Sequence, residues 1–174
     1  EADLRQRDFT VDALAIPLDG REVTPQKILD PTGGLIDLQL QIIRATGDSV
    51  FADDPLRLMR AVRLGAEMGL HIEPGTWAAI RGNSRLLSLV SAERTREELC
   101  RILEVTGALT SLHLLDSLGL LTVIIPELEE ARGVGQPKEH YWDVLEHSLE
   151  CVGAWEQVVR QSPGDSALMA EVPW

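Results

Sequence analysis

The sequence predicts an α+β fold, in which a short N-terminal β-hairpin is followed by an all-α region. The hairpin is indicated by the partial alternation of apolar residues over 8–18 and by the Asp19-Gly20 turn signal that follows. From about residue 54, apolar residues instead recur with helical spacing, and Gly, Pro and Ser residues divide this pattern into segments. We therefore expect the edge of a sheet joined to a series of helices.

The composition of the 174 residues is that of a globular protein, with 44% hydrophobic and 25% charged residues. No apolar run is long enough to span a membrane and no stretch resembles a signal peptide, so we expect a cytoplasmic protein without a membrane partner. The widely separated Cys100 and Cys151 are typical of free thiols in a reducing compartment. The net charge is −12, but residues 1–65 carry only −3 of it, so we expect any phosphate-facing surface in the first third.

The predicted hairpin pairs residues 8–18 with a short returning strand at 21–24. Two short strands alone do not form a stable domain, so we expect further strands upstream. The chain also lacks an initiator Met and stops without a closing element, which indicates a piece of a longer protein. One face of the first strand would hold Phe9, Val11, Ala13 and Ala15.

A turn-rich stretch over 28–37 contains Gly33-Gly34. This pair could be a flexible joint or a loop that approaches a phosphate, or an ordinary left-handed turn before a short helix at 34–39. Taken alone, the residues favour the ordinary turn. A short strand is predicted over 41–45.

The helical region begins with a helix predicted over 54–68, with Asp53 or Asp54 as its N-cap, Pro55 in its first turn and Gly69 at its end. Further helices are predicted over 74–87, from the Ser91 cap to about 107, and over 108–118, 119–125 and 141–160, with a polar loop over 127–140. We expect these side chains to face the core: Trp77, Leu99, Ile102, Leu103, Leu112 and Leu115.

The first of these helices carries a candidate recognition pair. Asp54 and Arg57 lie three residues apart, so an acceptor and a planar donor fork can point the same way from one turn. A carboxylate beside a guanidinium can match the edge of a nucleobase, whereas the alternative is a solvated ion pair worth less than ~1 kcal/mol. Arg57, Arg60 and Arg63 recur every third residue and form a basic edge.

A second candidate lies at the mouth of the first strand, where Arg5 and Arg7 precede Asp8. Arginine can bind a phosphate in bidentate fashion and the aspartate can accept from a ribose hydroxyl. The residues alone favour the alternative, a charged strand end on the surface.

The four histidines give only a weak metal signal. His140 and His147 enclose Asp143 and Glu146, but a closed site needs a further ligand group. His71 and His113 are expected to have no partners. The glycine-rich phosphate loops and nucleophile motifs of common enzymes are absent from the sequence.

Four motifs over residues 4–150 resemble the bacterial-type (class II) tRNA nucleotidyltransferase and poly(A) polymerase family. They resemble its Arg-Arg-Asp-Phe-Thr strand, its Asp-Pro-x-Gly-Gly-x-x-Asp-Leu segment, its Glu-Asp-Pro-x-Arg-x-x-Arg-Ala-x-Arg helix and the motif that follows this helix. In this sequence they are Arg7-Asp8-Phe9-Thr10, Asp30–Leu38, Asp53–Arg63, and Ser91-Ala92-Glu93-Arg94 with Glu97-Glu98-Leu99. Their common order makes the resemblance more specific than any one motif.

The resemblance implies a template-independent enzyme that adds C and/or A from CTP and ATP to the 3′ end of tRNA, or A to RNA. It implies that Arg7 and Asp8 bind the sugar and phosphates of the incoming nucleotide and that Asp54 and Arg57 read its base. For Arg60 and Arg63 we expect phosphate contacts or bracing salt bridges. It also implies supporting roles for Asp30, Gly33 and Gly34 as the spring between head and neck, and for Glu93 and Arg94 as a buttress of the reading helix.

The family's catalytic carboxylates, which hold two Mg²⁺ ions, would lie before Glu1. We therefore expect no catalytic residue in this chain, which alone would be inactive, and a nucleotidyltransferase in the full-length protein. The sequence departs from the family pattern at Gln6, where Arg is usual, at Asp12, where Asn is usual, and at Asp53, where Glu is usual.

Residues 136–147 resemble the entry into a metal-dependent phosphohydrolase (HD) domain, of which His147 would be the first ligand. The resemblance thus implies three regions: the C-terminal part of the head (1–48), a helical neck that binds RNA and nucleotide (49–126), and a linker with the first helix of a body or HD-type domain (127–174). The alternatives are an inactive helical module that binds RNA or protein, and the start of an HD phosphohydrolase.

Overall fold

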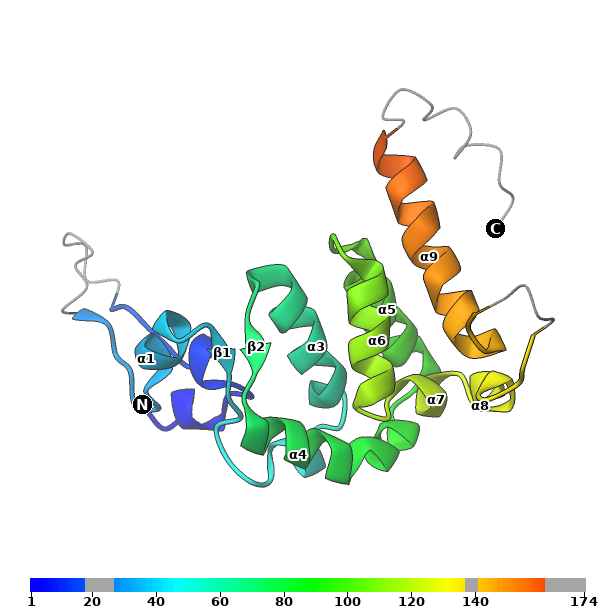
Figure 1. Cartoon of the computed structure of the whole chain (residues 1–174). Coiled ribbons are helices and arrows are strands. Elements are labelled where there is room, and N and C mark those ends of the chain that lie inside the picture. Colours follow the sequence, from blue (N-terminus) through cyan, green and yellow to red (C-terminus); the bar gives the residue numbers. More distant parts are fainter. Residues whose placement is uncertain (18–26, 137–140, 162–174) are drawn as a thin grey trace.

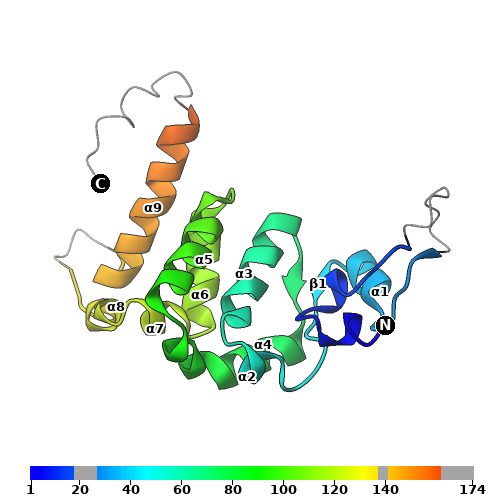
Figure 2. The same cartoon turned by 180° about the vertical axis from the view of Figure 1, so that it is seen from behind.

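The computed structural model describes residues 1–17, 27–136 and 141–161, whose elements follow one another in a curved row (Figure 1). The view from behind shows the same order, from the N-terminal elements through α3 and the α5–α6 pair to α9 (Figure 2). The elements are η1 (Leu4–Gln6), η2 (Thr10–Asp12), α1 (Gly34–Gln39), β1 (Ile42–Ile43), α2 (Val50–Asp53), α3 (Arg57–Met68), β2 (His71–Ile72), α4 (Pro74–Asn83), η4 (Ser84–Leu89), α5 (Ala92–Glu104), α6 (Ala108–Ser117), α7 (Leu121–Ile124), α8 (Glu127–Ala131) and α9 (Val144–Gln161).

The α+β class is confirmed, but the strand predicted over 8–18 is wrong. Thr10–Asp12 instead form the 3₁₀ turn η2, because the Asp12 carboxylate accepts a hydrogen bond from the Phe9 N–H at 3.2 Å and folds the chain back on itself. Isolated antiparallel bridges join Phe9 to Ala45 and Ala15 to Leu29. The predicted return strand at 21–24 lies outside the described residues.

The strand predicted over 41–45 is confirmed in shorter form as β1, which pairs with β2 in parallel. The register places Ile42 opposite His71 and Ile43 opposite Ile72. This small sheet fixes the segment that leads into α4 beside the N-terminal elements.

The helix predicted over 34–39 is confirmed as α1, and its start has two local causes. Gly33 has φ +81°, the left-handed conformation that glycine adopts without strain. The Asp30 carboxylate then accepts from the N–H groups of Gly34 at 2.7 Å and Leu35 at 3.1 Å. Side-chain capping therefore satisfies the first free donors of the helix.

The helix predicted over 54–68 begins at Arg57 instead of Asp54 and ends at Gly69 as expected, where φ is +66°. Asp54 has extended backbone, and its Oδ1 accepts from the Leu56 N–H at 3.3 Å. The carboxylate thus caps the turn that leads into α3, and the preceding residues form the additional short helix α2.

Helical segments are present in each region after residue 69 where the sequence predicts a helix, and two details of the prediction need correction. The Ser91 side chain caps α5 by accepting from the Arg94 N–H at 3.4 Å. Leu103 does not face the core, because it lies about 100° around the helix from the buried Ile102 and is 39% exposed. The loop predicted over 127–140 contains α8, in which acidic residues occupy the first turn and favour the helix N-terminus.

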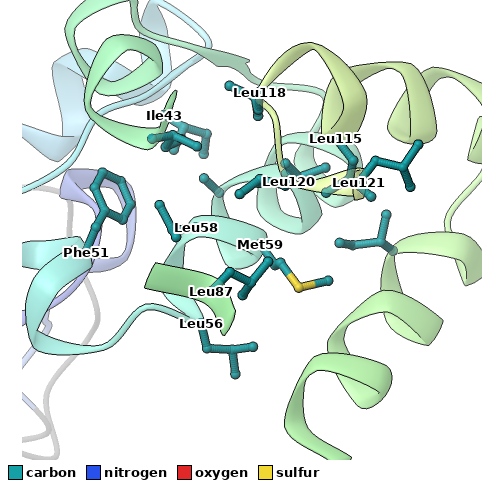
Figure 3. Packing of buried hydrophobic residues seen from close by; sticks show 14 of the residues in the cluster. Ile43, Phe51, Leu56, Leu58, Met59, Leu87, Leu115, Leu118, Leu120 and Leu121 are labelled. Atoms are coloured by element: carbon teal, nitrogen blue, oxygen red, sulfur yellow. The ribbon is translucent and has the colours of Figure 1, made fainter. Parts of the chain in front are cut away.

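One hydrophobic core runs from the N-terminal segment to α9. Near its N-terminal end, the rings of Phe9 and Phe51 lie 6.5 Å apart and join η2 to α2. Leu58 and Met59 of α3 are fully buried in this core, as are four leucines from the end of α6 to the start of α7 (Figure 3). These are Leu115, Leu118, Leu120 and Leu121. In the described residues, none of the helices is long and apolar enough to cross a membrane.

A substitution at Gly34 tests the close contact between α1 and η2. A Cβ at Gly34 would lie 2.0 Å from the Thr10 carbonyl oxygen, a backbone atom that cannot move aside alone. We expect Gly34→Ala to lower the free energy of unfolding by about 1–3 kcal/mol or more, as measured by urea denaturation. The matched control is Gly47→Ala, where a Cβ meets nothing within 4 Å. Equal stability of the two variants would contradict the packing described here.

Candidate functional site

Arg60 of α3 binds Asp8, which lies directly before Phe9 in the N-terminal segment. The guanidinium Nε donates to Asp8 Oδ2 at 2.5 Å, and the Asp8 side chain is 5% exposed. Burial would raise the pKa of Asp8, but hydrogen bonds from Asp12 and Arg60, together with the charge of Arg60, outweigh burial and hold that pKa below its ordinary value. Asp8 is therefore a charged, firmly placed carboxylate.

Asp12 lies beside the same guanidinium, with its Oδ2 3.8 Å from an Arg60 terminal nitrogen. Burial, and then the hydrogen bond and repulsion from the Asp8 carboxylate, raise the pKa of Asp12 to about 7. One arginine thus faces two carboxylates, and the pair titrates as a unit in which Asp8 keeps the negative charge and Asp12 holds the proton.

Arg63 of α3 binds α5. Its Nε donates to Glu98 Oε1 at 2.6 Å, and one terminal nitrogen donates to Glu67 at 2.7 Å. The side chains of Arg63 and Glu98 are 10% and 7% exposed. Arg63 is therefore a bracing residue that ties α3 to α5, in agreement with one of the two roles expected for it.

Asp54 and Arg94, which are distant in sequence, meet at the start of α3. An Arg94 terminal nitrogen lies 3.1 Å from Asp54 Oδ2 and 3.3 Å from Oδ1. Asp54 remains 34% exposed, and a carboxylate offers about four acceptor positions, so it can still accept a hydrogen bond from a ligand. Arg94 orients the carboxylate without burying it.

Arg57 is fixed separately from Asp54. One of its terminal nitrogens donates to the Val50 carbonyl at 3.3 Å, and its backbone N–H donates to the Asp54 carbonyl at 3.0 Å. The side chains of Asp54 and Arg57 therefore have different partners, and the guanidinium keeps most of its five donors for a ligand.

Of the other expected site residues, two are exposed and three are fixed at the start of α1. Arg7 is exposed and lies 3.4 Å from Asp3, and Glu93 is exposed near the start of α5. Gly33 directly precedes α1 and Gly34 is its first residue, and Asp30 caps this helix start. Hydrogen bonds from the backbone N–H groups hold the pKa of Asp30 below its ordinary value, although its slight burial opposes them.

Sequence reasoning missed a polar network behind the site, centred on Asp37. Its carboxylate accepts from the Thr10 hydroxyl at 2.7 Å and from Arg44 Nε at 3.1 Å, and Arg44 lies 3.5 Å from Glu73. Thr10 and Asp37 each belong to one of the four motifs, and this could have pointed to them as network residues. Arg44 belongs to none of the motifs. The network connects η2, α1 and the start of α4.

The expectation that His113 has no partner is wrong, because Glu146 and Glu150 of α9 face it. These partners lie far along the sequence, where spacing gives no information on contact. His147 lies on α9 with its Nε2 3.8 Å from Cys151 Sγ. His71 is exposed, and His140 lies outside the described residues.

A substitution at Asp12 tests whether the pKa of this carboxyl is raised beside Asp8 and Arg60. Since the pKa of Asp12 is raised to about 7 from an ordinary 3.8, the folded state binds more protons than the unfolded state between these values. Stability from this group therefore falls as the pH rises toward 7 and is lost above it. We expect Asp12→Asn to remove this loss, so that the variant gains stability relative to wild type between pH 5 and pH 8 in urea denaturation.

The exposed Asp48 provides the control, since Asp48→Asn should leave the pH dependence of stability unchanged. A stability difference between Asp12→Asn and wild type that is the same at both pH values would contradict the assignment.

Comparison with known proteins identifies the region to which this site belongs. Residues 1–44 match the family model described as the poly A polymerase head domain, and residues 69–132 match the probable RNA and SrmB-binding site of polymerase A. The chain is 35% identical to an A-adding tRNA nucleotidyltransferase of Deinococcus radiodurans over 97% of its length and 38% of that protein. It is 34% identical to a CC-adding tRNA nucleotidyltransferase of Halalkalibacterium halodurans over 83% of its length and 40% of that protein.

Among solved structures, the Bacillus stearothermophilus CCA-adding enzyme in complex with CTP is similar, with a TM-score of 0.62 and 39% identity over 68% of this chain and 29% of that chain. The chain thus spans about two fifths of the curated relatives named above. The ordered motifs, both family models and these relatives agree, and the chain belongs to the bacterial-type tRNA nucleotidyltransferase and poly(A) polymerase family.

Proposed function

We propose that this chain is the nucleotide-reading part of an RNA nucleotidyltransferase that adds C and/or A to the 3′ end of tRNA, or A to RNA. In this proposal Asp54 and Arg57 read the base of the incoming CTP or ATP. The observation that carries it is the contact of Arg94 with both Asp54 oxygens, which orients a partly exposed carboxylate three residues before an arginine whose remaining donors are available.

The chemistry of this pair selects C and A over G and U. The Asp54 carboxylate accepts from the exocyclic amine that C and A carry, and Arg57 donates to the adjacent ring nitrogen. G and U present a carbonyl oxygen at the amine position, which an ionised carboxylate repels. Two side chains can therefore take the place of a nucleic-acid template.

The second group, Asp8 with Arg60, is proposed to bind the sugar and phosphates together with Arg7. Asp8 is charged and fixed, so it can accept from a ribose hydroxyl, while Arg60 holds it in place and presents its remaining N–H groups. This assignment gives Arg60 both of its expected roles, as a brace and as a phosphate contact.

The family implies two catalytic Mg²⁺ ions, and the residues described here do not fit them. Mg²⁺ requires octahedral oxygen ligands, whereas the Asp8 and Asp12 carboxylates face the Arg60 guanidinium and each other. In this proposal these residues bind and select the nucleotide and take no part in a metal-dependent step. The inactivity of this chain in isolation stays a prediction.

We propose the same division of the chain as the motifs suggested, with the end of the head over 1–48, the neck over 49–126 and the start of a following domain over 127–174. The family-model matches at 1–44 and 69–132 support it. Relatives named as A-adding, CC-adding and CCA-adding all match this chain, so the matched region is common to proteins of all three activities.

The proposal predicts that Arg57→Ala in the full-length protein loses base selectivity. We expect the preference for CTP and ATP over UTP and GTP to fall about 5- to 150-fold, since a well-placed pair contributes about 1–3 kcal/mol of discrimination. Equilibrium binding of the four nucleotides, measured without RNA, checks this. The control is Arg101→Ala, an exposed arginine paired with Glu97 on α5. Unchanged selectivity of Arg57→Ala would contradict the reading role.

A further inference from the structure

A cluster of potential metal ligands lies at the interface of α6 and α9, away from the proposed nucleotide site. It consists of His113 on α6 and of Glu146 and Glu150 on α9. Their ligand atoms all lie within 4.8 Å of one another. The three side chains are partly buried, with 38%, 40% and 33% exposure, so an ion between them would still be reached by water.

The spacing of these atoms is that of ion pairs without a direct hydrogen bond. His113 Nε2 lies 3.7 Å from Glu146 Oε1 and also 3.7 Å from Glu150 Oε1, which is longer than a hydrogen bond. A tetrahedral ion with ligands at roughly 2.0–2.2 Å separates neighbouring ligand atoms by about 3.3–3.6 Å. The imidazole nitrogen therefore already lies at nearly this separation from each carboxylate, and all three ligand atoms lie within 4.8 Å of one another.

The helices that carry the ligands are held at close range by other contacts. A Cβ at Gly153 of α9 would lie 2.5 Å from Leu109 Cδ2 of α6, so the missing side chain allows close approach. The Glu156 carboxylate of α9 accepts from the Gly107 N–H at 2.7 Å, at the start of α6. Leu145 and Leu149 of α9 are buried next to the two glutamates in sequence. The ligand set is thus preorganised by packing that does not depend on an ion.

The two carboxylates of the cluster also favour a bound cation. Two carboxylates one helical turn apart repel each other, and the imidazole between them offers a ring nitrogen as a third ligand atom. A mixed set of one nitrogen and two oxygens suits Zn²⁺ and similar transition-metal ions, whereas Mg²⁺ and Ca²⁺ prefer oxygen ligands alone.

We propose that His113, Glu146 and Glu150 bind a divalent transition-metal ion of the Zn²⁺ type, which joins α9 to α6. Three protein ligands leave a fourth position for water. Because α6 lies within the region that matches the RNA-binding family model and α9 lies outside it, the ion would fix the following helix onto this region. The proposal does not depend on the nucleotide-reading function.

Metal binding by the full chain, after treatment with a chelator, tests this site. The probes are Zn²⁺, titrated calorimetrically in the presence of excess Mg²⁺, and Co²⁺, whose visible absorption reports tetrahedral coordination. We expect Zn²⁺ to raise the melting temperature of wild type. We expect His113→Ala and, separately, Glu150→Gln to weaken Zn²⁺ binding at least tenfold and to abolish both the melting-temperature rise and the Co²⁺ absorption.

Two control variants make the result specific. His71→Ala removes an exposed histidine from β2 and should bind Zn²⁺ as wild type does. A His147→Ala, Cys151→Ser double variant removes the other potential ligand pair of α9 and should also retain binding. Wild-type affinity in Glu150→Gln, or loss of binding only in the His147 and Cys151 variant, would overturn the proposal. Since Glu150→Gln retains the shape of the side chain, it tests the site even if His113→Ala fails to fold.

Discussion

The position of α3 depends on two arginines, Arg60 and Arg63, whose charges are balanced by carboxylates from two different neighbours. Arg60 meets Asp8 of the N-terminal segment and Arg63 meets Glu98 of α5, and both carboxylates are less than a tenth exposed. Removing one partner of a buried ion pair leaves an uncompensated charge, which typically costs about 3–5 kcal/mol. The helix is therefore fixed between its neighbours as much by the need to pair these charges as by its apolar face.

The same face of α5 that fixes α3 also orients the proposed reading residue. Arg94 and Glu98 lie four residues apart, one turn along α5, so a cation and an anion project side by side toward α3. Glu98 binds Arg63 in the middle of α3, and Arg94 binds Asp54 just before it begins. One helix face thus gives the Asp54 carboxylate a defined direction. In the proposed function, base recognition would therefore depend on how α5 packs against the start of α3.

The sequence indicated the local features of the fold because their causes are local. The start of α1 follows from the Asp30 cap and from Gly33, and the end of α3 follows from Gly69. The strand predicted at 8–18 failed because a side-chain bond from Asp12 outweighed apolar alternation in a segment with few strand partners among the described residues.

The candidate site was predictable only in its local part. The spacing of Asp54 and Arg57 and the order of the motifs indicated the start of α3 as the candidate site, but Asp54 precedes the helix, and the pattern gave none of the long-range partners. The contact of Arg94 with Asp54 and that of His113 with α9 depend on how helices pack, which no short spacing encodes. Motif order placed Arg94 near the reading helix only through the family resemblance.

A double-mutant cycle on Asp54 and Arg94 tests most directly whether the contact between these residues sets base selectivity. The quantity to measure is the ratio of CTP to UTP affinity in the full-length protein, for wild type, Asp54→Ala, Arg94→Met and the double variant. If Arg94 acts by orienting Asp54, each single variant loses selectivity and the double variant loses no more than Asp54→Ala alone. Additive losses, or full selectivity in Arg94→Met, would contradict this account.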